Sequence, residues 1–315
     1  MSTSGAEAGS AGLSVRLAAG PAGERALLDA AGRPNGEVLV ALGRSGCRLL
    51  RPDSTVVVTW PLPTSRIVMS DDDASALIIH DRRSGEIEVR QVDLTTHRLR
   101  YYGTLRPLAV ADSFDGTRWM IVDAINAAVV DLTAASPRIG WRPIESGTQC
   151  HALLRTPDGG TALVSSNHDP FVPPVTELRR WGPTMSGLTL RTTVTFAGNV
   201  TSYAVLPGGL LTVRKRTAEV FDGTSTSSFE LRANEHLRTA GDLIARYRID
   251  RPAPSLLVAR WPGQEPVIVY EHGPMDESPR VRSHGDVATV WDPAGRIHVV
   301  NLATRTTLSV VRVLR

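Results

Sequence analysis

Short apolar runs bounded by turn residues recur along the whole chain, and apolar residues at helical spacing are almost absent. Clear examples are residues 37–42, 76–79, 210–213 and 287–290. Runs of four to six such residues, flanked by Gly, Pro, Asp or Asn, are typical of buried β-strands. The pattern therefore predicts an all-β protein.

Turn signals precede the apolar runs at a regular spacing. They lie about 34 to 49 residues apart, which brackets the 40–45 residues of a four-stranded propeller blade. The seven signals are Asn35-Gly36, Asp72-Asp73, Asp115-Gly116, Asp158-Gly159, Pro207-Gly208, Gly241-Asp242 and Gly285-Asp286.

A second mark repeats further into the units, at residues 92–96, 130–134 and 300–304. Each copy reads apolar, Asp or Asn, Leu, then small residues, and the three resemble the end of the third strand in WD-repeat blades. The chain thus resembles a degenerate WD-repeat-like bacterial β-propeller over residues 25–315, although the Trp-Asp pair is absent at these positions. Lys215 is the only lysine among 35 cationic residues. That bias indicates a GC-rich genome and suggests an actinobacterial source.

We predict a seven-bladed β-propeller with four-stranded antiparallel blades, since a ring of thin sheets buries each sheet against two neighbours. Six or eight blades stay open, because the first and fifth units are faint. Residues 1–20 are expected to form a flexible tail or a closing strand, and residues 21–315 a single domain. The predicted units are 25–60, 65–105, 107–144, 149–196, 200–231, 237–270 and 279–314.

Composition narrows the function classes. Hydrophobic residues make up 42% of the chain, enough for a core, and the net charge of +3 is too even to indicate nucleic acid. No apolar stretch is long enough for a membrane span. Two cysteines cannot form a disulfide framework, and residues 1–20 lack a basic start followed by an apolar block. We expect a monomeric cytoplasmic protein.

The resemblance to propellers implies that ligands bind where the innermost strands begin and where the second strands turn into the third. Arginine predominates among the binding candidates there, and its planar fork suits carboxylate and phosphate groups. The candidates are Arg66, Arg82, Arg83, Tyr203, Arg214, Lys215, Arg216, Arg248, Arg282 and Trp291.

Catalytic candidates centre on the fourth unit. His168 and Asp169 lie in a proline-rich insertion at residues 165–174, and His151 belongs to the same unit; His284 joins them from the last. They could supply an acid–base pair or metal ligands, but Asn-His-Asp-Pro is also typical of a plain turn, which is the interpretation we favour. The sequence contains no HxH or HExxH pattern, so it gives no indication of a zinc site.

The two cysteines are expected to be structural. Cys150 precedes His151 on a strand, so the two side chains should point to opposite faces and form no dyad. Cys47 is expected to be a small buried hydrophobe in a third strand.

Three functions fit the sequence. The first is a non-catalytic platform for a protein partner in a bacterial multi-component system, with no cofactor. The second is an enzyme at the channel mouth, a lyase, cyclase or hydrolase of specialised metabolism, for which a divalent metal is implied. The third is a sensor of a small molecule or peptide. We favour the platform because no catalytic constellation is complete.

Overall fold

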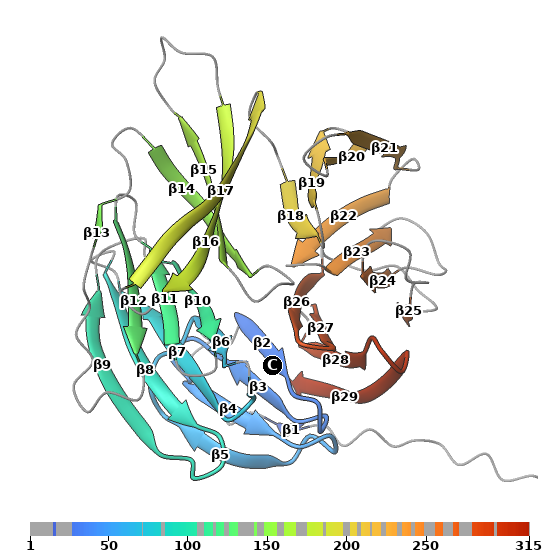
Figure 1. Ribbon diagram of the computed structural model, residues 1–315. Helices are drawn as coiled ribbons and strands as arrows, with labels where there is room; N and C mark the ends of the chain where they lie inside the picture. Colours follow the sequence, from blue (N-terminus) through green and yellow to red (C-terminus); the bar gives the residue numbers. More distant parts are fainter. Residues whose placement is uncertain are drawn as a thin grey trace, which may run out of the picture.

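A computed structural model shows a protein made of strands, and the residues that the structure describes contain no helix (Figure 1). No helix among them, accordingly, has the length and apolar character to cross a membrane. The described residues are 15–16, 27–70, 72–82, 86–105, 110–115, 118–122, 126–131, 142–143, 148–155, 161–167, 175–184, 187–197, 202–206, 209–214, 216–221, 225–231, 235–240, 243–248, 256–260, 267–270, 279–292 and 295–314.

Within these residues the strands form seven sheets, each a meander of four consecutive strands in which neighbours run antiparallel. The first sheet contains β2 (Asp29–Gly32), β3 (Val38–Ala41), β4 (Cys47–Leu50) and β5 (Val56–Trp60). The second contains β6 (Arg66–Met69), β7 (Ser75–Asp81), β8 (Ile87–Asp93) and β9 (Leu99–Leu105). The third contains β10 (Val110–Asp115), β11 (Arg118–Val122), β12 (Asn126–Asp131) and β13 (Arg142–Pro143).

The remaining sheets continue in chain order. The fourth contains β14 (Thr148–Arg155), β15 (Thr161–Asn167), β16 (Val175–Thr184) and β17 (Gly187–Ala197). The fifth contains β18 (Ser202–Leu206), β19 (Gly209–Arg214), β20 (Thr217–Phe221) and β21 (Thr226–Glu230). The sixth contains β22 (Glu235–Ala240), β23 (Leu243–Arg248), β24 (Leu256–Arg260) and β25 (Val267–Tyr270). The seventh contains β26 (Arg280–His284), β27 (Val287–Trp291), β28 (Arg296–Asn301) and β29 (Thr306–Leu314).

A short strand from the start of the chain extends the seventh sheet. β1 (Val15–Arg16) runs parallel to β29, with Val15 opposite Val313 and Arg16 opposite Leu314. The seventh sheet already holds four strands of its own, so β1 adds a fifth strand to it and is not needed to complete a four-stranded sheet.

The all-β prediction and the antiparallel four-stranded units are confirmed. The three turn signals that lie wholly within the described residues, at 35–36, 72–73 and 285–286, fall between the first and second strands of a sheet. The second mark ends a third strand: Asp93 closes β8 and Asn301 closes β28. The carboxylate of Asp93 accepts the backbone N–H of Thr95 at 2.9 Å and of Thr96 at 2.7 Å, which turns the chain toward the fourth strand.

The first strand of each sheet is here called its inner strand, and β2, β6, β10 and β26 lie toward the middle of the molecule (Figure 1). Outer strands such as β5 and β9 lie at the periphery (Figure 1). Inner strands of successive sheets contact each other from β2 through β6, β10, β14, β18 and β22 to β26, and β26 also contacts β2. The end at which the inner strands begin is called the mouth face.

The first and seventh sheets carry buried residues on both faces, which explains why their apolar runs do not alternate with polar residues. In β3, Val38 and Val40 pack toward the seventh sheet, whereas Leu39 and Ala41 pack toward the second. β27 does the same, since Trp291 packs toward the first sheet and Val290 toward the sixth.

The first and seventh sheets approach closely at Gly32, the last residue of β2. Its backbone N–H donates to Oγ1 of Thr289 at 2.7 Å. A Cβ on Gly32 would lie 2.6 Å from Cγ1 of Val299, so no larger residue fits without a shift. Ser309 adds a further bond between these sheets, from its hydroxyl to the carbonyl of Gly36 at 2.7 Å.

Candidate functional site

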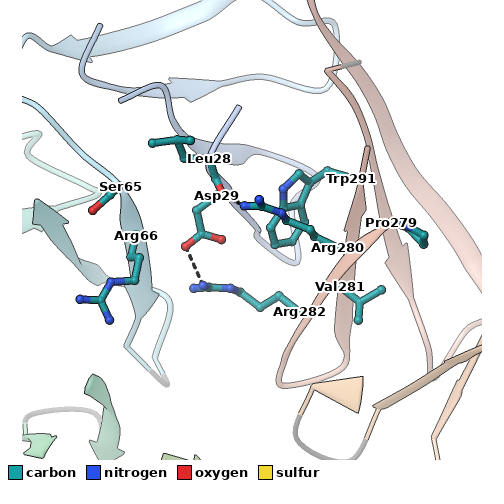
Figure 2. Close-up of a pocket in the computed structure, with 9 residues that line it drawn as sticks. All are labelled: Leu28, Asp29, Ser65, Arg66, Pro279, Arg280, Val281, Arg282 and Trp291. Carbon is teal, nitrogen blue, oxygen red and sulfur yellow. Dashed lines mark hydrogen bonds and ion pairs between the residues drawn. The ribbon is translucent and has the colours of Figure 1, made fainter. Parts of the chain in front are cut away.

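A pocket of about 530 Å³ opens on the mouth face, where the first, second and seventh sheets meet. Each of the three inner strands contributes its first residue, namely Asp29 from β2, Arg66 from β6 and Arg280 from β26. The residue before each strand also lines the pocket. Figure 2 shows these side chains around one opening; the complete lining is Leu28, Asp29, Ser65, Arg66, Pro279, Arg280, Val281, Arg282 and Trp291.

The deepest charged group in the pocket is Asp29, whose side chain is 6% exposed. Its Oδ2 accepts Nη2 of Arg282 at 2.7 Å and the backbone N–H of Ile67 at 2.7 Å, and its Oδ1 accepts the backbone N–H of Ala30 at 3.0 Å. Arg282 also donates to the carbonyl of Ile67. One carboxylate therefore joins the first, second and seventh sheets.

Burial dominates the electrostatics of Asp29. Desolvation raises the pKa of its carboxyl group, and the Arg282 guanidinium opposes that rise, followed by the amide of Ile67. An acid in this position needs its arginine, because a buried carboxylate without a counter-charge is strongly destabilising.

Arg66 is held at the rim of the pocket by its own sheet. Its Nη2 lies 2.7 Å from Oδ1 of Asp81, and Ser65 donates to Oδ2 of the same carboxylate at 2.6 Å. Asp81 ends the second strand of this sheet and Arg66 begins the first. The loop that enters an inner strand and the loop that joins a second strand to a third, which we expected on one face, thus meet at this rim.

Arg280 differs from the other two arginines of the pocket. Its Nη1 donates to the carbonyl of Leu28 at 2.6 Å, and none of the described carboxylates lies within ion-pair distance of it. It is the direct cross-strand partner of Trp291, and Figure 2 shows the guanidinium beside the indole. Trp291 is 4% exposed, and its indole N–H is buried with no hydrogen-bond partner in the described part of the chain.

Three of the predicted binding residues, Arg66, Arg282 and Trp291, come together in this pocket. The others described with side chains lie elsewhere. Arg82 is exposed and bonds Glu88 of its own sheet at 2.9 Å. Arg216 is exposed in the turn before β20 and donates to the carbonyl of Leu231 at 3.1 Å. Arg248 is partly buried at the end of β23.

His284 lies at the other end of its strand from the mouth face, because it is the last residue of β26. Its Nε2 is 2.9 Å from Oδ1 of Asp73, in the turn between β6 and β7. The structure therefore separates His284 from the pocket and from the loops in which the sequence grouped it.

The remaining candidates have no described side chains. His151 lies in β14, Tyr203 in β18 and Arg214 ends β19, while His168, Asp169, Arg83 and Lys215 lie outside the described residues. The β14–β15 ladder shifts register between Cys150 and Ala152, at His151. Strict alternation along the strand, on which we based the separation of Cys150 from His151, does not hold at such a shift.

Two further points concern metals and thiols. Among the described residues, no group of three or more His, Cys, Asp or Glu side chains is arranged to hold a metal ion. Cys47 begins the third strand β4 and is fully buried, as predicted, and burial raises the pKa of its thiol.

Sequence reasoning missed Asp29 and Arg280. Asp29 stands alone in the apolar run of residues 26–31, and a single acid within such a run is a signal that could have identified it. Arg280 follows Pro279 at a strand start, which carries no signal of its own.

No family model matches the chain, and no curated protein matches it in sequence. Solved structures do match it in fold. The β-propeller domain of Cps50 (Swd1) from Myceliophteria thermophila is 12% identical with a TM-score of 0.55, and the match covers 92% of this chain and 98% of that one.

Two more structures give similar values. The computationally designed protein Ika8 is 11% identical with a TM-score of 0.53, covering 91% of this chain and 87% of its own. The dihydro-heme d1 dehydrogenase NirN, in complex with DHE, is 14% identical with a TM-score of 0.52, covering 92% of this chain and 67% of its own. At these identities the likeness concerns the fold alone: the protein has a β-propeller fold.

Proposed function

We propose that this β-propeller is a non-catalytic platform that holds a protein partner on its mouth face, and that its seven sheets are the blades of a WD-repeat-like ring. The observation that carries the proposal is the pocket shared by three sheets. Its walls are fixed before any ligand arrives, because Asp29 with Arg282 and Arg66 with Asp81 already form ion pairs. A preformed site loses less conformational freedom on binding.

The chemistry of the pocket favours recognition over catalysis. Each carboxylate in or beside it is engaged by an arginine, so neither is placed to exchange a proton with a substrate. The enzyme hypothesis depends on His168 and Asp169, which lie outside the described residues, and it stays a prediction of the sequence.

The experiment compares two charge reversals on opposite faces. Arg280→Glu changes the pocket, whereas Arg51→Glu makes the same change in the exposed turn after β4. That turn lies at the far end of the first sheet, because Leu50 pairs with Val38 and Val38 with Gly32, the last residue of β2. Each tagged variant is purified from the native cells beside the wild type.

A stoichiometric companion protein should accompany the wild type and Arg51→Glu and be lost from Arg280→Glu. The platform is refuted if the wild type retains no companion, or if the companion is retained equally by Arg280→Glu. Circular dichroism and the thermal midpoint of each variant show that the fold is intact.

A further inference from the structure

Among the residues that the structure describes, one arginine of the pocket has no carboxylate at ion-pair distance. Arg282 is paired with Asp29, and Arg66 with Asp81, at 2.7 Å in each case. Arg280 has no described carboxylate at ion-pair distance, and its Nη1 donates a hydrogen bond to the carbonyl of Leu28. A guanidinium presents five N–H donors in a fork, so most of the donors of Arg280 stay available to a ligand.

The wall around Arg280 is apolar. Leu28, Pro279, Val281 and Trp291 line the pocket beside it. The indole of Trp291 faces Arg280 across the β26–β27 ladder, and an aromatic ring next to a guanidinium holds the cation in place while its edge remains free to bond an acid.

We propose that the pocket binds a segment of the partner protein in which a single carboxylate stands next to an apolar side chain. The inference rests on the platform function and names the chemistry of the partner. The carboxylate bonds the fork of Arg280, and the apolar side chain packs against Leu28, Val281 and Trp291.

Charge balance selects a carboxylate over a phosphate. A carboxylate carries one negative charge and matches the single uncompensated arginine, whereas a phosphate carries close to two at neutral pH. The second charge of a phosphate would face the buried carboxylate of Asp29, whose own arginine is already engaged.

The test uses short blocked peptides and the full-length protein. The reference peptide is Ac-Ser-Gly-Leu-Asp-Leu-Gly-Ser-NH2, carrying a fluorophore, and binding is followed by anisotropy at low ionic strength. Three variants replace its Asp by Asn, its Asp by phosphoserine, or both Leu by Gly. On the protein side, Arg280→Gln removes the free guanidinium and Arg51→Gln is the matched control.

The reference peptide should bind the wild type and Arg51→Gln alike. Its affinity should fall about tenfold with Asn in place of Asp and about tenfold with Arg280→Gln, as expected for one charge-assisted hydrogen-bonded pair. The Gly peptide should bind about tenfold more weakly through loss of apolar burial. Arg280→Lys should fall between wild type and Arg280→Gln, because it keeps the charge without the fork.

Three results would overturn the inference. They are no binding of the reference peptide, equal binding of the Asp and Asn peptides, and tighter binding of the phosphoserine peptide than of the Asp peptide. If the companion protein is nevertheless lost from Arg280→Glu, the platform stands and only the carboxylate chemistry fails. If Arg280→Glu retains the companion protein as the wild type does, the platform proposal itself fails.

Discussion

Asp29 is the residue through which three sheets meet, since its carboxylate bonds the backbone of the second sheet and an arginine of the seventh. The side chain of Arg282 is 26% exposed, so this ion pair is only slightly open to water. Breaking a buried pair by removing one partner costs about 3–5 kcal/mol, because the other charge is left uncompensated.

Arg282→Met should therefore lower the free energy of unfolding by about 3–5 kcal/mol at neutral pH, measured by urea titration. Adding Asp29→Asn to Arg282→Met should restore part of the lost stability, because it removes the carboxylate charge that has no partner left. Arg280→Gln serves as the control, because Arg280 is an exposed arginine in the same strand. It should lower the free energy of unfolding by less than about 1 kcal/mol.

The loss in Arg282→Met should also depend on pH. Burial raises the pKa of Asp29, and without Arg282 nothing of equal size opposes the rise. A carboxyl group whose pKa is raised on folding destabilises the folded state at a pH above its folded pKa. This destabilisation disappears at a pH low enough to protonate the group in both the folded and the unfolded state. The difference between Arg282→Met and wild type should shrink as the pH falls; a constant difference would show that Asp29 is not the cause.

At this scale the sequence identifies residues by type but not by partner. Arg282 and Trp291 were predicted as binding residues because of their positions in a repeat unit, and they do line the pocket. Asp29 could not be paired with Arg282, because the two are 253 positions apart and meet only when the seventh sheet lies beside the first. Local patterns carry no information about such contacts.

The third-strand turn is the element that repeats most clearly. Asp93 and Asn301 occupy the same place in their sheets: Asp93 accepts two backbone N–H groups of the following turn, and Asn301 accepts one, from Thr304. The next residues, Leu94 and Leu302, are buried, and their N–H groups bond the turn before the second strand. In both copies the mark thus has two structural roles, to form the turn and to bury a leucine.

The turn predicts a specific pH effect at Asp93. The backbone amide of Thr96, more than any other group, holds the pKa of Asp93 below its usual range. Stability from such a group is present above the pKa of the unfolded state and is lost as the pH falls through the folded one.

Asp93→Ala should lower the free energy of unfolding by about 0.5–1 kcal/mol at neutral pH, and by less in acid. Asp93→Asn keeps the acceptor, as Asn301 does naturally, and should cost little at either pH. Chemical denaturation at the two pH values measures both. Equal losses for Ala and Asn would mean that the hydrogen bonds of the turn are not the source of its stability.

The strand pattern could be predicted because both its signals are local. Apolar runs mark strands that are buried on both faces, and the Asp-Leu mark ends a third strand. His284 shows where this reasoning stops: its strand was recognised, but which end of the strand it occupies depends on bounds that differ by a few residues. The structure places it with Asp73, away from the pocket.

At the scale of the whole molecule, the first and last sheets meet by side-chain packing. Val38, Val40 and Leu50 of the first sheet contact Ile297, Val299 and Val311 of the seventh in one cluster. At Gly32 the two sheets approach closely, because a Cβ there would overlap with the side chain of Val299. Substitution of Gly32 therefore tests the junction directly.

Gly32→Ala should destabilise the protein by about 1–3 kcal/mol through overpacking, measured by urea unfolding. Hydrogen exchange should quicken in the first and seventh sheets together and less in the sixth. Gly285→Asn is the control, because Gly285 has a φ of +52° that Asn accepts and nothing lies within 4 Å of its Cβ position. Faster exchange confined to the first sheet would contradict a direct junction between the two.

Because β2 to β5 and β26 to β29 come from stretches of chain that are far apart in sequence, the junction has a consequence for biosynthesis. Val38 and Val40 leave the ribosome long before the side chains that cover them, from Val287 to Val313. A nascent chain therefore carries an uncovered apolar flank until those residues have been translated. Stalling or truncation before that point would leave the flank exposed and prone to aggregation.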